Sequence, residues 1–299
     1  MGTVAESETL KRIGRRRTLI AYLLLAPFLI LVSLFFFYPL AQAVQVSFYR
    51  VKLPTDVYIG YKNYLRLFLD ENFFLVLTNT LIYGAICVAG VIFSIVPGLF
   101  IASNYLTARP RLKKSFQMTI SWTFITSWVV LGTAWQWVFL VGAGSQYAGR
   151  GLLSISPLTN ELTTVPTVGL IFVWAGIGYN ALLFLAALKA VPKEIFEAAH
   201  VDGATGWQMA RHITIPATKP ILVFLIVNGF IWSFQAYEPI AALTDGGPGW
   251  ASSSTVHYMV RQAMYGLDFG YAAAMGLIVA VIVLTLSVIQ FRYIYGRFV

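Results

Sequence analysis

Long stretches without a charged residue dominate the chain, and short polar segments separate them. Six stretches can each hold the ~20 apolar residues with which a helix crosses a hydrocarbon core of about 30 Å. They are residues 18–49, 72–108, 115–149, 162–188, 220–237 and 269–291. The pattern predicts an all-α integral membrane protein with six transmembrane helices, the first at about residues 19–44. An even number of spans places both termini on the same side of the membrane.

Composition supports this class, and the placement of charge gives an orientation. With 58% hydrophobic and 11% charged residues, the chain is unlike a soluble domain, and its single cysteine, Cys87, excludes an internal disulfide. Of the 21 Lys and Arg residues, fifteen lie on the side that holds both termini, which the positive-inside rule assigns to the cytoplasm. This placement, and not nucleic-acid binding, explains the net charge of +9. The expected organisation is a basic N-terminus (1–18), a membrane domain (19–292) and a short tail (293–299), with both ends cytoplasmic.

A polar segment, Pro192–Pro220, connects the fourth and fifth stretches on the predicted cytoplasmic side. Gly203 follows a short helical pattern and suits the left-handed residue that ends a helix. Thr205 and Gln208 have capping-box spacing and predict a second helix, which Pro216 is expected to end. The segment is therefore predicted to form a helix–glycine–helix loop. On periodicity alone, a solvated hairpin between two spans is an equally good interpretation.

The sequence of this loop, EAAHVDGATGWQMARHITIP, resembles the EAA loop in membrane subunits of binding-protein-dependent ABC importers. The residues that match the general pattern are Glu197, Ala198, Ala199, Gly203 and Pro216, and those that match the carbohydrate branch are Asp202, Trp207 and Gln208. Met209 and Ala210 stand where that branch often has Arg and Phe. The turn cluster LTDGGPG at 243–249 resembles the first permease subunit of maltose- and glycerol-3-phosphate-type systems.

The resemblance implies one permease half of an ATP-driven sugar importer in a bacterial or archaeal cytoplasmic membrane. The implied partners are a second permease subunit, two ATPase subunits that bind ATP and Mg, and an extracytoplasmic solute-binding protein. The loop would sit in a groove of an ATPase subunit and tilt the spans when the ATPase dimer closes. The residues expected to make this coupling are Glu197, Ala198, Ala199, Asp202, Gly203, Trp207 and Pro216.

No motif for catalysis or metal binding occurs in the sequence. The phosphate-binding pattern GxxxxGK[ST] is missing, as are HExxH, CxxC and GxSxG. We therefore expect no catalytic residue, no bound cofactor and no metal site on this chain, and we expect partner subunits to hydrolyse ATP.

Polar side chains inside the stretches suggest a substrate path. Asn228, Trp232 and Gln235 have i, i+4, i+7 spacing on one helical face, Tyr237 follows them, and Asn180 lies in the fourth stretch. Polar groups in a membrane usually face a bundle interior or an aqueous path, and amides with aromatic faces suit a sugar. Hydrogen bonding between helices is the better explanation of each residue taken singly, and the substrate path depends on the residues forming one stripe. Since the stripe has no basic residue, it favours a neutral sugar over glycerol 3-phosphate or another polar solute.

Two further features leave alternatives open. Ala272, Gly276 and Ala280 repeat at four-residue spacing and allow close approach of another helix, from the same bundle or from another subunit. A secondary transporter or channel would need buried titratable groups or inverted repeats with broken helices. The stretches contain no charge, and Glu238 follows directly after the fifth, which argues against proton coupling.

Overall fold

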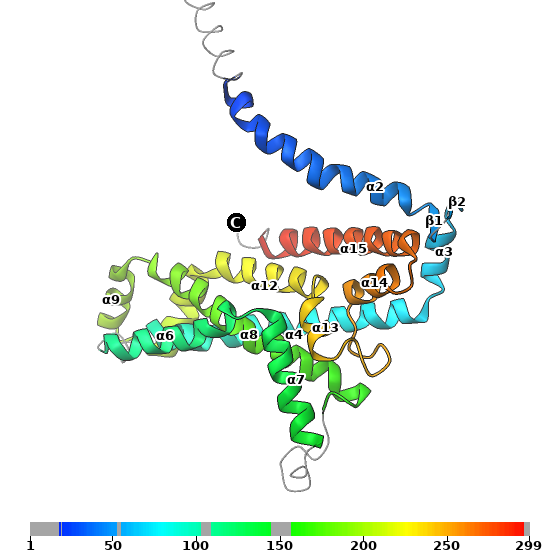
Figure 1. Cartoon of the computed structure of the whole chain (residues 1–299). Helices are drawn as coiled ribbons and strands as arrows, with labels where there is room; N and C mark the ends of the chain where they lie inside the picture. The colour runs from blue at the N-terminus through cyan, green and yellow to red at the C-terminus, as the bar shows by residue number, and fades with distance from the viewer. Residues whose placement is uncertain (1–17, 19, 53–54, 103–108, 145–156, 296–299) are drawn as a thin grey trace, which may run out of the picture.

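The computed structural model describes residues 18, 20–52, 55–102, 109–144 and 157–295, and these residues are mostly helical (Figure 1). Almost all of the predicted N-terminal segment 1–18 lies outside the described residues. The last four residues of the predicted tail, 296–299, also lie outside them.

Long apolar helices form the body of the protein. Four described helices are long and apolar enough to cross a membrane: Ile20–Val46, Glu71–Ile101, Glu161–Lys189 and Phe269–Arg292. The first contains a π-helical turn, η1 (Ser33–Phe37), and α2 (Tyr38–Val46), and the others belong to α4 (Glu71–Ala102), α8 (Glu161–Lys189) and α15 (Phe269–Tyr295). A fifth span results if Gly206–Ala217 and α12 (Lys219–Phe234), which meet at 70°, are one broken helix. The count of six stays a prediction.

The third apolar stretch forms two helices where one span was expected. α6 (Pro110–Ile125) ends where Thr126 becomes extended, with φ −75° and ψ 135°, and α7 (Trp128–Gly144) begins two residues later. α7 leaves the bundle at a steep angle to α6 (Figure 1). The apolar stretch 115–149 therefore does not form one continuous helix. No proline or glycine marks the break, so hydropathy could not reveal it.

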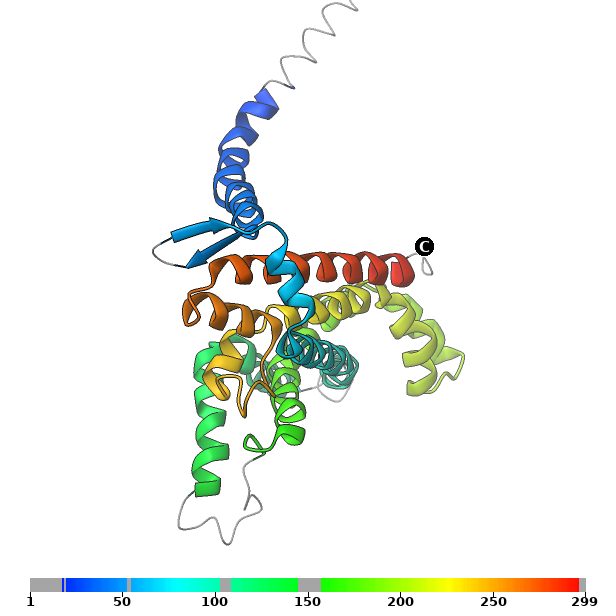
Figure 2. The ribbon, with the colours of Figure 1, turned by 90° about the vertical axis from the view of Figure 1, so that its right-hand side faces the viewer.

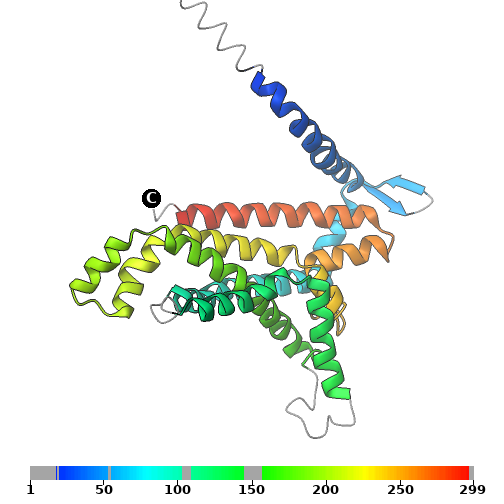
Figure 3. The same ribbon diagram turned by 60° about the vertical axis from the view of Figure 1, so that its left-hand side comes forward.

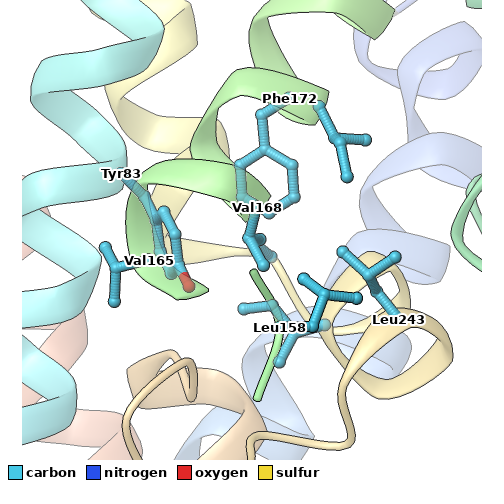
Figure 4. Packing of buried hydrophobic residues seen from close by; sticks show 9 residues of the cluster. Tyr83, Leu158, Val165, Val168, Phe172 and Leu243 are labelled. Carbon is cyan, nitrogen blue, oxygen red and sulfur yellow. The ribbon is translucent and has the colours of Figure 1, made fainter. Parts of the chain in front are cut away.

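Side chains from α4 and α8 build the centre of the bundle. Tyr83 of α4 meets Val168 and Phe172 of α8, and Leu243 from α13 (Glu238–Leu243) closes the cluster (Figure 4). Close backbone contact also joins α8 to α6. A Cβ atom added at Gly178 would lie 1.9 Å from the carbonyl oxygen of Ile120. Only glycine permits this approach of the two helices.

A small sheet corrects the all-α expectation. β1 (Tyr49–Lys52) and β2 (Thr55–Tyr58) pair antiparallel beside the end of the first helix (Figure 2). Tyr49 and Tyr58 face each other in the register with ring centroids 5.3 Å apart, a cross-strand pair that stabilises a hairpin. These strands are short and lie between apolar helices, so the hydropathy pattern did not separate them from a loop.

α3 (Lys62–Phe68) follows the hairpin and ties it to the C-terminal helices. Asn63 Nδ2 donates hydrogen bonds to the carbonyl oxygens of Ser47 and Tyr49, at 2.8 and 2.9 Å. The Arg66 guanidinium lies 2.6 Å from a carboxylate oxygen of Asp268, at the start of α15. The segment before α4 is thereby held against the start of α15.

The bundle has two distinct ends. The β-hairpin, α3 and α14 (Thr255–Met264) lie at one end, here called the hairpin end (Figure 1). α9 (Lys193–Val201) and the end of α15 lie at the opposite end, here called the α9 end. The first helix diverges from the body, and none of its most apolar window is buried (Figure 1).

Candidate functional site

The polar segment after α8 forms a helix–glycine–helix hairpin, as the sequence predicts. α9 ends at Val201, Asp202 caps it, and Gly203 follows with φ +73°. The N–H groups of Gly203 and Ala204 donate to the carbonyl oxygens of His200 and Ala199, at 3.1 and 2.9 Å. This is the hydrogen-bond pattern of a Schellman motif, in which a left-handed residue ends the helix.

The second helix begins with the predicted capping box. Gln208 N donates to Thr205 Oγ1 at 3.3 Å, and Thr205 N donates to Gln208 Oε1 at 2.7 Å. The helix ends one residue beyond the predicted Pro216, because α10 (Gly206–Met209) continues through η2 (Ala210–Thr214) into α11 (Ile215–Ala217). The π-helical turn widens the helix just before Pro216, where the ring would otherwise clash with a preceding carbonyl. Thr218 is the C-cap of the helix.

This hairpin projects from the α9 end of the bundle (Figure 3). Its surface carries large apolar side chains in an otherwise polar segment, since Trp207 is 71% exposed and Val201 89%. Of the seven residues expected to couple to an ATPase, six are exposed and Ala199 is partly buried. The seven therefore gather on one protruding element.

A cavity of about 440 Å³ lies between α4, α8 and α12, near the starts of α7 and α13. All five residues predicted for the substrate path line it, namely Asn180, Asn228, Trp232, Gln235 and Tyr237. The predictions from the fourth and fifth apolar stretches thus converge on one space. Their role in transport stays a prediction.

Aromatic faces form much of the cavity wall. The rings of Tyr179 and Trp232 are stacked, with centroids 6.2 Å apart and planes 12° apart. Trp128 meets Trp232 edge-on at 6.3 Å. Trp128 was not predicted from the sequence, because only the break before α7 brings it to the cavity. Cys87 packs against the core cluster around Tyr83 and also lines the cavity.

Charge is scarce around the cavity. Glu238 is the one acidic residue among the described residues that line it, and none of them is Lys, Arg or His. Across the described part of the chain, no group of three or more His, Cys, Asp or Glu side chains is placed to hold a metal ion. The lining offers amide hydrogen bonds and aromatic surface, the chemistry that binds a polar, uncharged solute.

A buried histidine supports one wall of the cavity from the hairpin end. The His257 ring stacks on Tyr237 with centroids 5.7 Å apart. His257 Nδ1 lies 2.8 Å from Ser253 Oγ, and Nε2 lies 3.4 Å from a carboxylate oxygen of Asp245. Burial lowers the pKa of His257, while its hydrogen bond and charge interaction with Asp245 oppose that shift. Arg261 contacts Asp245 at 3.0 Å and favours the neutral imidazole.

Helix breaks frame the same space. α12 ends at Phe234, and α13 begins at Glu238, so the intervening residues Gln235–Tyr237 cross the cavity wall outside a regular helix. α13 packs closely on α7, since a Cβ atom at Gly132 would lie 2.7 Å from that of Ala242. Non-helical backbone at membrane depth is tolerated where it lines a cavity.

Comparison with known proteins assigns the family. The model of the family described as binding-protein-dependent transport system inner membrane component matches residues 90–295. The chain is 31% identical over 281 residues to the sn-glycerol-3-phosphate transport system permease protein UgpA of Yersinia pestis, covering 91% of this chain and 93% of UgpA. It is 32% identical over 286 residues to the arabinooligosaccharides transport system permease protein AraP of Halalkalibacterium halodurans, covering 93% and 88%.

A solved structure shares the fold over nearly the whole chain. A crystal structure of a bacterial ABC transporter involved in the import of the acidic polysaccharide alginate contains a chain with TM-score 0.80 and 25% identity. The match covers 97% of this chain and 99% of that one. Together with the family match, it agrees with the EAA-loop resemblance in the sequence. The chain therefore belongs to the family of inner-membrane components of binding-protein-dependent transport systems, the permease subunits of ABC importers.

Proposed function

We propose that this chain is one permease half of an ATP-driven importer and conducts an uncharged sugar through the cavity between α4, α8 and α12. The observation that carries the proposal is the lining of that cavity. Asn180, Asn228 and Gln235 offer amide groups to hydroxyls, and the stacked rings of Tyr179 and Trp232 offer a flat apolar face to sugar C–H bonds.

The relatives leave the charge of the substrate open. UgpA is named for glycerol 3-phosphate, AraP for arabino-oligosaccharides, and the solved transporter for an acidic polysaccharide. A phosphate or carboxylate is normally bound by Arg, Lys or a helix N-terminus. The described lining residues supply Glu238 and no cationic side chain, which favours a neutral sugar. Glycerol 3-phosphate is the second candidate, because the relatives include its permease.

Coupling to ATP hydrolysis would use the α9–α10 hairpin, at the end of the bundle that the positive-inside rule assigns to the cytoplasm. Trp207 and Val201 are exposed apolar side chains that a groove in an ATPase subunit would bury. Gly203 fixes the angle between the two helices, so the hairpin can move as a rigid body. The complex would contain a second permease subunit, two ATPase subunits with ATP and Mg, and an extracytoplasmic solute-binding protein.

A substrate panel tests the proposal. The complete complex is reconstituted in proteoliposomes with its binding protein, and ATP hydrolysis is measured with neutral oligosaccharides, an acidic oligosaccharide and glycerol 3-phosphate. We expect stimulation by a neutral sugar, and we expect Trp232→Ala to reduce uptake of that sugar. Trp122→Ala is the matched control, since Trp122 is 74% exposed and does not line the cavity.

Two outcomes would contradict the proposal. Stimulation by the anionic solutes alone would show that a neutral sugar is not the substrate. Uptake that continues without any ATPase subunit and stops with an uncoupler would instead identify a secondary transporter.

A further inference from the structure

A layer of buried polar contacts lies behind one wall of the cavity. This wall includes Ala236 and Tyr237, which lie between α12 and α13 and outside a regular helix. A wall outside a regular helix depends on contacts from neighbouring elements for its position, because its backbone groups lack a continuous helical ladder. The start of α14 supplies those contacts.

Ser254 supports the backbone of the wall. Its hydroxyl donates to the carbonyl oxygen of Ala236 at 2.5 Å, and the same oxygen atom accepts from the backbone N–H of His257 at 3.1 Å. Ser254 is fully buried, and it is both the N-cap of α14 and the partner of the wall. A displacement of α14 would therefore displace the backbone of Ala236.

His257 supports the next residue of the wall. Its ring lies against the ring of Tyr237, with centroids 5.7 Å apart and planes 27° apart. Both ring nitrogens have neighbours, Ser253 Oγ at 2.8 Å and a carboxylate oxygen of Asp245 at 3.4 Å, and these fix the plane of the imidazole. A Cβ atom at Gly246 would lie 2.8 Å from the same ring, so the loop packs closely on it. The fixed imidazole limits the orientations that the Tyr237 ring can take.

α4 anchors the polar layer to the body of the bundle. Asn79 Nδ2 donates to the carbonyl oxygens of Ala251 and Ser253, at 2.8 and 3.3 Å. Thr80 Oγ1 accepts from the backbone N–H of Thr255 at 2.9 Å. The loop before α14 and the first residue of α14 are thereby fixed to a helix that itself lines the cavity.

We propose that Ser254 and His257 are positioning residues for the substrate cavity, which hold Ala236 and Tyr237 so that the Tyr237 side chain meets the solute in one orientation. Neither Ser254 nor His257 lines the cavity, so both act through the wall. An ordered wall loses less conformational freedom when a solute binds, so the support should appear in the affinity for the solute. This inference rests on the proposed function, because it takes the cavity to be the path of the solute.

The order of the Tyr237 ring can be measured without a solute. In the full chain, purified with its co-purifying subunits into nanodiscs, 3-fluorotyrosine replaces Tyr237, and ¹⁹F relaxation reports the motion of the ring. We expect a rigid ring in the unaltered chain and a mobile ring in His257→Asn. In His257→Phe the ring should stay rigid, because phenylalanine keeps the flat face against Tyr237. Tyr258→Phe is the matched control, since Tyr258 is 3% exposed in the same helix but donates to Asp70 at 2.8 Å.

Ser254→Ala is an independent variant that keeps the test decisive if His257→Asn fails to fold. It removes the hydrogen bond to Ala236, leaves the His257 ring in place, and should also mobilise the Tyr237 ring. Unchanged ring mobility in either variant would overturn the assignment of that residue. A mobile ring in His257→Phe would contradict the role of the stacked face. An equal gain of mobility in Tyr258→Phe would attribute the effect to general loosening of α14 and would overturn the whole inference.

Uptake measures the consequence for transport. The concentration dependence of ATP-driven uptake is recorded in proteoliposomes with the neutral oligosaccharide that the unaltered complex takes up. In His257→Asn we expect KM to rise about 2- to 10-fold with kcat nearly unchanged, the effect of ordering one side chain on binding, and His257→Phe should restore KM. A fall in kcat at unchanged KM would contradict the inference. If the unaltered complex takes up no neutral oligosaccharide, the proposed function fails, whereas the ¹⁹F measurement still decides whether His257 positions Tyr237.

Discussion

Replacing Gly203 with valine tests whether coupling depends on the left-handed backbone conformation that joins the two helices of the α9–α10 hairpin. Gly203 has φ +73°, and no heavy atom lies within 4 Å of the position that a Cβ would take. The substitution therefore causes no collision, and its whole effect comes from the backbone. An L-residue in the left-handed region is disfavoured by about 1–2 kcal/mol, and a β-branched residue by more. That energy changes the population of the correct hairpin shape by a factor of about 5–30.

The matched control is Gly206→Val in the same hairpin. Gly206 also has no heavy atom near its Cβ position, but it begins α10 without a positive φ. We expect Gly203→Val to lose most ATP-driven uptake and most co-purifying ATPase while membrane insertion persists, and Gly206→Val to retain both. Gly203→Asn should be intermediate, since asparagine tolerates the left-handed region.

The assays are uptake into proteoliposomes and pull-down of the ATPase through a tag on this chain. If Gly203→Val keeps full uptake and full ATPase recovery, the hairpin angle has no role in coupling. If Gly206→Val fails equally, the loss comes from any added side chain and not from the left-handed turn.

Three other outcomes follow from the structure. Maleimide labelling of Cys87, which lines the cavity, should slow when the transported sugar is bound; an unchanged rate at saturating sugar would place the sugar elsewhere. Gly178→Ala should lower the free energy of unfolding by about 1–3 kcal/mol, seen as a lower melting temperature, because its Cβ would meet the Ile120 carbonyl. The pKa of His257 is lower in the folded protein than in the unfolded chain, so the unfolded chain takes up a proton first as the pH falls. The contribution of neutral His257 to folding stability is therefore fully present above about pH 6.5 and is lost as the pH falls further. Melting temperatures measured between pH 7 and 5 should fall less in His257→Gln, and an equal fall in both proteins would exclude this histidine as the cause.

Local chemistry made the α9–α10 hairpin predictable. A left-handed glycine and a capping box act over a few residues, so Gly203 and Thr205 could be assigned from sequence alone. The π-helical turn before Pro216 was not predicted, because such a turn has no sequence signal as strong as proline itself. The β-hairpin was missed for a related reason, since its strands are four residues each and lie between apolar helices.

The cavity was predictable only in part. Helical spacing placed Asn228, Trp232 and Gln235 on one face, and the structure brings Asn180 to the same space. Trp128 could not be found, because its position depends on the break after α6, where the apolar pattern continues unchanged. Hydropathy records that a residue is apolar but not whether it faces lipid, a partner or a cavity.

The proposed function requires that the α9–α10 hairpin is cytoplasmic and that a separate ATPase subunit holds it. A photo-crosslinking amino acid in place of Trp207, which is 71% exposed, tests this in intact cells. We expect a covalent adduct with the ATPase subunit and no labelling of position 207 by a membrane-impermeant reagent applied from outside. An adduct with the extracytoplasmic binding protein, or labelling from outside, would contradict it.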